Sequence, residues 1–210
     1  MSHFLTMETE SRHRCMIYEG SPSQKLPVLA AMIQSKLNEG YQCLYLNSAP
    51  MVAGMRSTLS ALGIDVEAEI TQGRLILSAD LVSPGGSFDC KLMLENLEFF
   101  LDEALDKGYK GLWASGDMTW EFGPEKDFSK LLEYELGLEE VFKRRKELSG
   151  VCQYHRDTLP QDVMRQSLLT HKSIAITETI TQINPFYLKS AIESASNQEL
   201  DQVINLLCRL

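Results

Sequence analysis

Short apolar runs alternate with longer segments of helical periodicity along this chain. The run Cys15–Tyr18 ends at the polar residues 19–22, a pattern typical of a buried strand followed by a turn. From Ser23 to Asn38 apolar residues recur every three or four positions, and Gly40 follows where a helix commonly ends. The pattern therefore predicts a strand, a turn and a helix at the start of the chain.

The same alternation continues further along the chain. Further strands are predicted at 43–46, 74–78, 112–115, 151–154 and 174–177, and further helices at 50–62, 89–107, 128–147 and 161–169. Strands that alternate with helices of this length indicate βαβ units, because parallel neighbours need a crossover connection. The sequence therefore predicts an α/β fold of three layers, α/β/α, with a mainly parallel central sheet.

The two ends of the chain differ from this pattern. Residues 1–12 are expected to form a flexible lead-in. After Asn184-Pro185 the tail, residues 185–210, offers one or two amphipathic helices. We expect one domain over residues 13–184 and a helical tail that packs either on the sheet or on a partner subunit.

Composition limits the choice of partners. The chain of 210 residues has a formal net charge of −9 and a sequence pI near 5.0. Binding along a phosphate backbone depends on clustered Lys and Arg, so no direct contact with nucleic acid is expected. The basic run KRRK at 143–146 is flanked by glutamates and is typical of a solvated helix face.

Cysteine usage and hydropathy indicate the compartment. No stretch approaches the roughly 18 to 20 apolar residues that span a bilayer, and the N-terminus lacks the apolar run of an export signal. The five cysteines contain no CxxC pair, which predicts neither a disulfide framework nor a zinc knuckle. We therefore expect a cytoplasmic protein without a membrane segment.

Polar residues follow several of the predicted strands. In an open parallel sheet ligands bind beyond the carboxyl ends of the strands, so these residues are candidates for a binding site. Asp117 is the expected polar anchor and Trp120 the expected aromatic wall of a small-molecule pocket; in the alternative, Asp117 caps the next turn and Trp120 fills the gap beneath it. The candidate ligand-binding residues are Tyr18, Glu19, Gly20, Ser21, Ser23, Lys25, Asn47, Asp117, Trp120, Glu135, Tyr154 and His155.

The first turn is comparable to a phosphate loop, because it joins a strand to a helix whose N-terminus attracts anions. The motif G-x-x-x-x-G-K-[ST] needs a second glycine, a lysine for the phosphates and a hydroxyl for Mg²⁺. Here Lys25 comes one residue too early, Gln24 replaces the glycine and Leu26 replaces the hydroxyl residue. Ordinary ATP hydrolysis is not expected. Weak anion binding by Ser21, Ser23 and Lys25 and a plain capped turn both stay open.

Signatures of metal binding or covalent catalysis are weak. His13, Cys15 and His155 do not have the spacing of a metal site. His13 is expected at the amino end of its strand, opposite to the carboxyl edge of the sheet where His155 lies. A catalytic Cys152–His155 pair is disfavoured, because alternation along a strand sends the two side chains to opposite faces. His171, near a helix C-terminus, is expected to be stabilised by the helix dipole. No metal ligand, catalytic residue or cofactor is assigned.

A family resemblance covers about residues 13–187. The segments HRCMIYEG, GYKGLWASGDMTWEFG, LLEYELGLEEVF and CQYHRD occur in this order, and the GDMTW block followed by CQYHR is the most specific element. Together they resemble the MEDS family, the methanogen and methylotroph sensory domain. The resemblance implies a degenerate RecA-like fold, related to circadian-clock ATPases and without a working phosphate loop, that senses small hydrocarbon derivatives alone or fused to DNA-binding or histidine-kinase modules.

Two residues depart from the family pattern. The family commonly has Glu where this chain has Asp117, and Asp where it has His155, so the ligand of a relative is not transferred to this chain. The tail shows no helix-turn-helix or kinase module, so a stand-alone version of the domain is expected.

Three functions stay open from the sequence. The first is a sensory domain, not an enzyme, that binds a small molecule at the carboxyl rim and signals to a regulatory partner such as a kinase or transcription factor. The second is a nucleotide-binding RecA-like protein with weak or no ATPase activity, using Lys25 and Asp117. The third is an assembly protein that forms homo-oligomers through its RecA-like surface or its tail.

Overall fold

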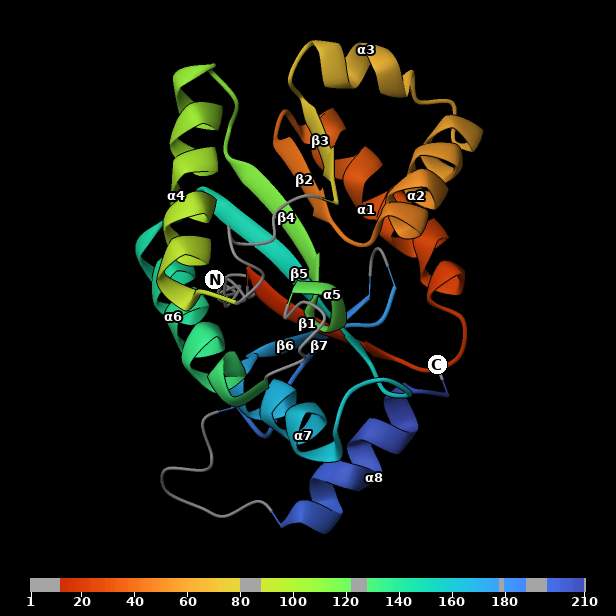
Figure 1. The fold of residues 1–210 in the computed structure, drawn as a ribbon, viewed down its shortest axis with the longest axis vertical. Helices are drawn as coiled ribbons and strands as arrows, with labels where there is room; N and C mark the ends of the chain where they lie inside the picture. Colours follow the sequence, from red (N-terminus) through yellow and green to blue (C-terminus); the bar gives the residue numbers. More distant parts are fainter. Residues whose placement is uncertain (1–11, 80–87, 122–127, 178–179, 188–195, 210) are drawn as a thin grey trace, which may run out of the picture.

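One seven-stranded sheet forms the centre of the computed structural model (Figure 1), which describes residues 12–79, 88–121, 128–177, 180–187 and 196–209. The predicted lead-in, apart from residue 12, and the side chain of Trp120 lie outside the described part of the chain. The strands are β1 (His13–Tyr18), β2 (Gln42–Leu46), β3 (Leu75–Ser78), β4 (Leu112–Asp117), β5 (Leu148–His155), β6 (Ser173–Ala175) and β7 (Thr181–Ile183).

The helices lie between these strands in the sequence, as the alternation predicts. They are η1 (Pro22–Lys25), α1 (Leu26–Glu39), α2 (Ala49–Ala61), α3 (Val66–Thr71), α4 (Cys90–Asp106), α5 (Met118–Glu121), η2 (Phe128–Lys130), α6 (Leu131–Arg144), α7 (Gln161–Thr170) and α8 (Asn197–Leu207). The short helix α3 was not expected. It begins at Val66 and is preceded by the N-cap Asp65, whose carboxylate accepts the Ala68 N–H.

The sheet has the order β3-β2-β4-β5-β1-β6-β7. Its first six strands are parallel, and β7 runs antiparallel to β6. The expectation of a mainly parallel sheet is therefore confirmed, with β7 as an unpredicted edge strand. The order places β1 inside the sheet, where His13–Tyr18 pairs in register with Gly150–His155 of β5.

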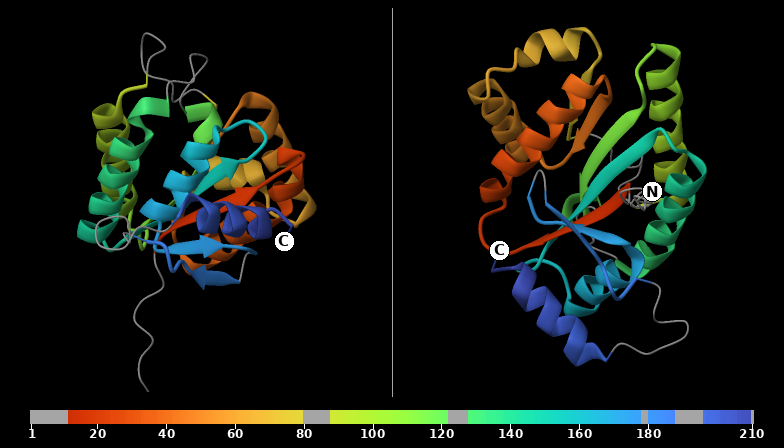
Figure 2. Two further views of the ribbon diagram at one scale, coloured as in Figure 1. Left: turned by 90° about the horizontal axis from the view of Figure 1, so that it is seen from below. Right: turned by 180° about the vertical axis from the view of Figure 1, so that it is seen from behind.

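Two hydrophobic cores fill the spaces between the sheet and the helices. Helices α1, α2 and α3 cover one face, and α4, α6, α7 and α8 contribute to the core on the other (Figure 2). Because successive strand residues point to opposite faces, Cys15 and Ile17 enter one core while Met16 and Tyr18 enter the other. Burial on both faces explains the continuous apolar runs of the strands.

The described part of the tail packs on its own chain. Helix α8 begins with a capping box between Ser196 and Glu199, and it buries Leu200, Ile204 and Leu207. It lies against α7, where the Arg165 guanidinium donates two hydrogen bonds of 2.8 Å to Asp201. Within the described residues, no helix is long and apolar enough to cross a membrane.

Candidate functional site

An open cleft of about 470 Å³ lies at the carboxyl edge of the sheet. It is formed where the chain leaves β1, β2, β4 and β5, which is the position where parallel sheets bind ligands. Several of its side chains were expected there from the sequence. The cleft is lined by Pro22, Asn47, Ser48, Met51, Asp117, Thr119, His155 and Thr158.

Asp117 is held from two sides at the floor of this cleft. The Tyr18 hydroxyl donates to its Oδ2 atom at 3.2 Å, and the Thr119 backbone N–H donates to its Oδ1 atom at 2.9 Å. Burial and the negative charge of Asp117 raise the pKa of Tyr18 above its usual value, so the phenol stays protonated and donates. Asp117 therefore caps the turn after β4 and lines the cleft at the same time.

The turn after β1 is braced by the end of β5. His155 Nε2 donates to the Gly20 carbonyl oxygen at 2.8 Å, and the Gly20 N–H donates to Asp157 Oδ2 at 2.8 Å. A phosphate loop turns its backbone N–H groups toward the anion. Here the Gly20 N–H already bonds a carboxylate. Gly20 has φ of 81°, a left-handed conformation that glycine adopts without steric cost.

The other residues of the expected anion site point elsewhere. The hydroxyls of Ser21 and Ser23 bond each other at 2.8 Å on the protein surface. Lys25 lines a separate small cavity beside Ile176 and Leu207. Lys25 and Asp117 therefore border different cavities, and these two side chains do not form a shared cradle for a nucleotide phosphate and its metal.

Two more predicted rim residues have partners at this edge. The Asn47 side chain donates to the Tyr45 hydroxyl at 3.1 Å and accepts the Ser48 N–H at 2.8 Å, which fixes the entry into α2. Glu19 forms an exposed ion pair of 3.4 Å with Arg156. The backbone of Trp120 belongs to α5, directly after Asp117.

Glu135 and Tyr154 do not line this cleft. Glu135 projects from α6 and Tyr154 from β5, and the Tyr154 hydroxyl donates to Glu135 Oε1 in the core beneath α6. The expectation that these two side chains share the rim with Asp117 is corrected by this placement. Tyr154 follows the alternation of β5, which turns it toward α6, whereas the next residue, His155, faces the cleft.

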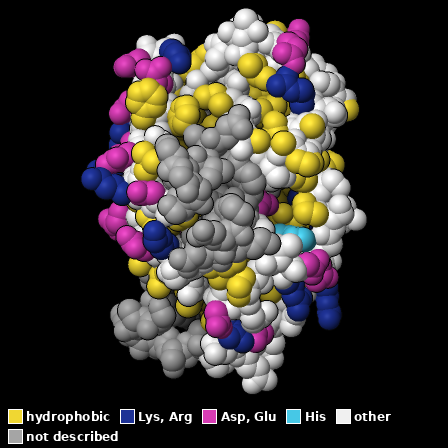
Figure 3. All heavy atoms as spheres, in the orientation of Figure 1, with side chains coloured by type: hydrophobic (Ala, Val, Ile, Leu, Met, Phe, Trp, Pro, Cys, Tyr) yellow, Lys and Arg dark blue, Asp and Glu magenta, His cyan; other side chains and the backbone are white. Residues whose placement is uncertain are grey.

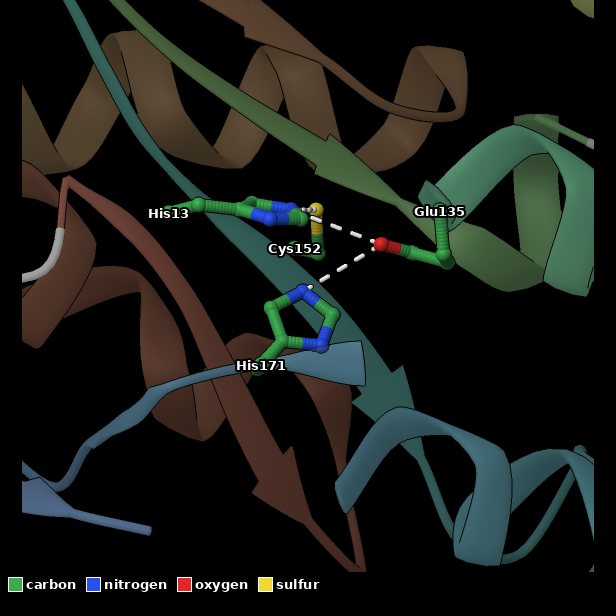
Figure 4. Close-up of side chains that lie close together, drawn as sticks. All are labelled: His13, Glu135, Cys152 and His171. Carbon is green, nitrogen blue, oxygen red and sulfur yellow. Dashed lines mark hydrogen bonds and ion pairs between the residues drawn. The ribbon is translucent and has the colours of Figure 1, made fainter. Parts of the chain in front are cut away.

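The same core contains a cluster of His13, Glu135, Cys152 and His171 (Figure 4). Glu135 Oε2 lies 3.4 Å from His13 Nε2 and 3.3 Å from His171 Nε2, and Cys152 Sγ lies 3.4 Å from His13 Nε2. His13 is at the amino end of β1, as expected, and therefore far from His155. The contact of His13 with Cys152 and the closeness of His171 were not predicted from the sequence, because no spacing motif links these residues.

The cluster is almost fully buried, which shifts the titration of its members. Burial opposes a charge on His13, but hydrogen bonds to Glu135 and Glu139 outweigh it and raise the pKa of His13. Burial also opposes the charge of Glu135, but the neighbouring His171 and His13 keep its pKa below the usual value. Burial and the charge of His13 lower the pKa of His171 to about 4, so His171 is neutral at pH 7.

Comparison with known families decides the relationship. A model of the MEDS domain, described as the methanogen/methylotroph, DcmR sensory domain, matches residues 12–172. The chain belongs to the MEDS family. The match covers both the carboxyl-edge cleft and the buried cluster of this MEDS domain. None of the curated proteins compared with the chain matches it.

Solved structures show the fold of the MEDS domain to be RecA-like. The flagellar accessory protein FlaH from Methanocaldococcus jannaschii aligns with a TM-score of 0.57 and 12% identity, covering 89% of this chain and 83% of FlaH. The uncharacterized protein PH0321 from Pyrococcus horikoshii, solved in complex with an unknown peptide, aligns with a TM-score of 0.54 and 15% identity, covering 79% of this chain and 77% of PH0321. The predicted RecA-like α/β fold is confirmed.

Proposed function

We propose that this MEDS domain acts as a sensor that binds a small hydrocarbon derivative or one-carbon compound in the carboxyl-edge cleft. The supporting observation is the composition of the cleft wall. Met51 and Pro22 supply apolar surface, and Asp117, Asn47 and His155 supply a few fixed polar groups. Small-molecule sites combine these two elements, because apolar surface gives affinity and placed polar groups give orientation.

Contacts between the cleft residues connect a bound ligand to the neighbouring turns and to α1. His155 stacks on Tyr18 with ring centroids 5.0 Å apart, and Tyr18 in turn holds Asp117. Pro22 begins η1, which leads directly into α1. A ligand that contacts Asp117 and Pro22 therefore shifts η1 and the start of α1. A regulatory partner that binds at the start of α1 then binds the two states with different affinity. We infer a cytoplasmic kinase or transcription factor as the class of partner.

The charge distribution of the protein favours an uncharged or weakly polar ligand. Figure 3 shows Lys and Arg side chains beside Asp and Glu side chains along the edges of the face drawn. With a net charge of −9 and Asp117 at the cleft floor, the chain repels anionic ligands at long range. This favours a small neutral molecule over a phosphorylated one.

Titration of the full chain with methylated and halogenated one-carbon compounds and short alcohols tests the proposal. Saturable chemical-shift changes are expected at residues of the cleft, and Asp117→Asn should weaken binding at least about tenfold, the effect of one lost polar contact of ordinary strength. Leu206→Ala, an exposed change on α8, is the control and should bind like the wild type. Absence of saturable binding for all compounds would overturn the proposal, as would binding that Asp117→Asn leaves unchanged.

A second candidate is a nucleotide-binding protein with weak or no ATPase activity. Its support is the RecA-like fold together with a carboxylate, Asp117, at the end of β4, where hydrolases of this architecture hold Mg²⁺. It predicts saturable binding of MgATP and any turnover to be abolished in Asp117→Asn. Titration with MgATP in the same assay separates the two candidates. Only the nucleotide-binding candidate predicts that MgATP binds in the cleft.

A further inference from the structure

We propose that His13, Glu135, Cys152 and His171 bind one divalent transition-metal ion, with Zn²⁺ as the best match, in a closed four-ligand site beneath α6. This site is separate from the cleft and from the sensory function proposed above. The ligands come from the start of β1, from α6, from β5 and from the residue that follows α7. The metal would join segments that are distant in the sequence.

The geometry of the four side chains fits a tetrahedral ion. Their ligand atoms all lie within 4.8 Å of one another, and three of the separations are 3.3, 3.4 and 3.4 Å. Bonds of 2.0–2.3 Å to a central Zn²⁺ give ligand separations of about 3.3–3.8 Å in a regular tetrahedron. Three edges already have this length, and the widest pair closes by about 1 Å when the metal binds.

Three of the four ligands are oriented by a second residue in the manner of a metal site. A metal-bound histidine usually donates its other ring N–H to a carboxylate or a backbone carbonyl. His13 Nδ1 lies 3.1 Å from Glu139 Oε2, and His171 Nδ1 donates to the Ser167 carbonyl at 2.8 Å. Both Nε2 atoms are thereby directed at the cluster. The Tyr154 hydroxyl donates to Glu135 Oε1, which leaves Oε2 toward the histidines.

The contact between His171 and Glu135 would be stabilised by a bound cation. Because His171 Nδ1 carries the proton that bonds Ser167, its Nε2 atom presents a lone pair, and this lone pair faces Glu135 Oε2 at 3.3 Å. Both atoms are buried; His171 Nε2 has no hydrogen-bond partner among the residues that the structure describes, while Glu135 Oε2 also lies 3.4 Å from His13 Nε2. Two buried acceptors that face each other repel, and a bound cation would turn the repulsion into two bonds.

The chemistry of the donors selects the class of metal. Imidazole nitrogen and thiolate sulfur favour Zn²⁺ and related ions over Mg²⁺ and Ca²⁺, which prefer oxygen. A Cys152 thiolate and the Glu135 carboxylate together carry two negative charges, so a divalent ion is neutralised by its own ligands. Neutrality matters here because an uncompensated charge in a buried site is costly. Binding releases the protons of the Cys152 thiol and of any protonated His13.

The metal competes with an arrangement that needs none. In that arrangement a protonated His13 bridges Glu135 and Glu139, at 3.4 and 3.1 Å. The two states differ in whether Cys152 is a thiolate. A spectroscopic probe of metal–sulfur bonding therefore separates them.

Metal analysis of the full chain, followed by exchange of the ion for Co²⁺, tests the proposal. We expect about one Zn²⁺ per chain after dialysis, and a Co²⁺ form with the visible bands of a tetrahedral ion and a thiolate-to-cobalt charge-transfer band. Saturating Zn²⁺ at about 100 times its dissociation constant should raise the Tm of the metal-free chain by about 5–10 °C. A wild-type chain without stoichiometric metal and without these bands would overturn the proposal.

Variants assign the ligands. Cys152→Ser should abolish the charge-transfer band and His171→Gln should weaken Co²⁺ binding at least about tenfold. Cys43→Ser is the matched control, because Cys43 is also buried but lies on β2, where it bonds the Ile33 carbonyl. It should keep the wild-type spectrum. A folded Cys152→Ser variant that retains the band would contradict the assignment; should that variant not fold, the wild-type spectrum and His171→Gln decide the question.

Discussion

His155 Nε2 donates to the Gly20 carbonyl oxygen at 2.8 Å, so that the last residue of β5 holds the turn that follows β1. The same imidazole stacks on Tyr18, whose hydroxyl bonds Asp117. One side chain therefore supports both the turn and the floor of the cleft. Its position is one of the two at which this chain departs from the family pattern noted in the sequence.

Removal of this imidazole should loosen the turn. His155→Ala deletes the bond to Gly20 and the stacking on Tyr18, and we expect a loss of about 1–3 kcal/mol in the free energy of unfolding, the range for a buried hydrogen bond that loses its partner. Urea denaturation measures this loss, and hydrogen exchange should speed up at the backbone amides of Gly20, Ser21 and Ser23. Arg156→Ala, which removes the exposed pair with Glu19 and a hydrogen bond with Cys208, is the control and should cost less than about 1 kcal/mol.

The centre of the sheet should not tolerate a methyl group at Gly150. A Cβ atom there would lie 2.3 Å from the Ala114 carbonyl oxygen of the neighbouring strand, so β4 and β5 would have to separate. We expect Gly150→Ala to cost more than about 3 kcal/mol. Ser149→Ala is the control, since the buried Ser149 hydroxyl has no hydrogen-bond partner among the described residues, and it should change stability by less than about 1 kcal/mol. Equal effects in urea denaturation would contradict the steric explanation.

The tail helix should contribute to the stability of the domain. Ile204 is fully buried, whereas Leu206 on the same helix is 59% exposed. Ile204→Ala should cost about 2–5 kcal/mol through lost apolar burial and a cavity. Leu206→Ala should stay within about 0.5 kcal/mol. A small effect of Ile204→Ala in thermal or urea denaturation would show that α8 does not dock on α7 in solution.

The ion pair between α7 and α8 should make part of the stability depend on pH. Hydrogen bonds from Arg165 and then Gln161 lower the pKa of Asp201 to about 2. Because the folded-state pKa is lower than that of the unfolded chain, about 3.9, the contribution of the pair is complete above that pH and is lost as the pH falls toward 2. The difference in urea midpoint between wild type and Asp201→Asn should therefore be constant from pH 5 to 7 and shrink below pH 4. A difference independent of pH would contradict this linkage.

Local patterns predicted most of the fold. The apolar runs located the first six strands, and the helical periodicity located the long helices to within a few residues, because each of these segments is buried on at least one face. Helix α3 and strand β7 were missed. Both are very short, and the sequence TQI of β7 has no apolar alternation, so their structure comes from neighbouring elements.

The carboxyl-edge cleft could be predicted from the sequence in part, whereas the buried cluster of His13, Glu135, Cys152 and His171 could not. Asn47, Asp117 and His155 meet in the cleft because each directly follows or ends a strand, and strand direction alone brings such residues to one edge. Lys25 was placed there as well, but one further turn of chain directs it to another cavity. The buried cluster depends on how α6 crosses the sheet, a packing relationship that leaves no spacing signal for His13, Cys152 or His171.

The order of strands also has a consequence for synthesis. β1 is translated before the other strands that the structure describes, yet both of its neighbours, β5 and β6, come after β2, β3 and β4 in the sequence. Its apolar residues therefore stay without a pairing partner until translation has passed His155. Pairing over such a sequence distance is slow, and an unpaired strand edge is prone to aggregation. The nascent chain should therefore depend on protection of β1, by chaperones or by transient contacts with α1, until β5 and β6 have emerged.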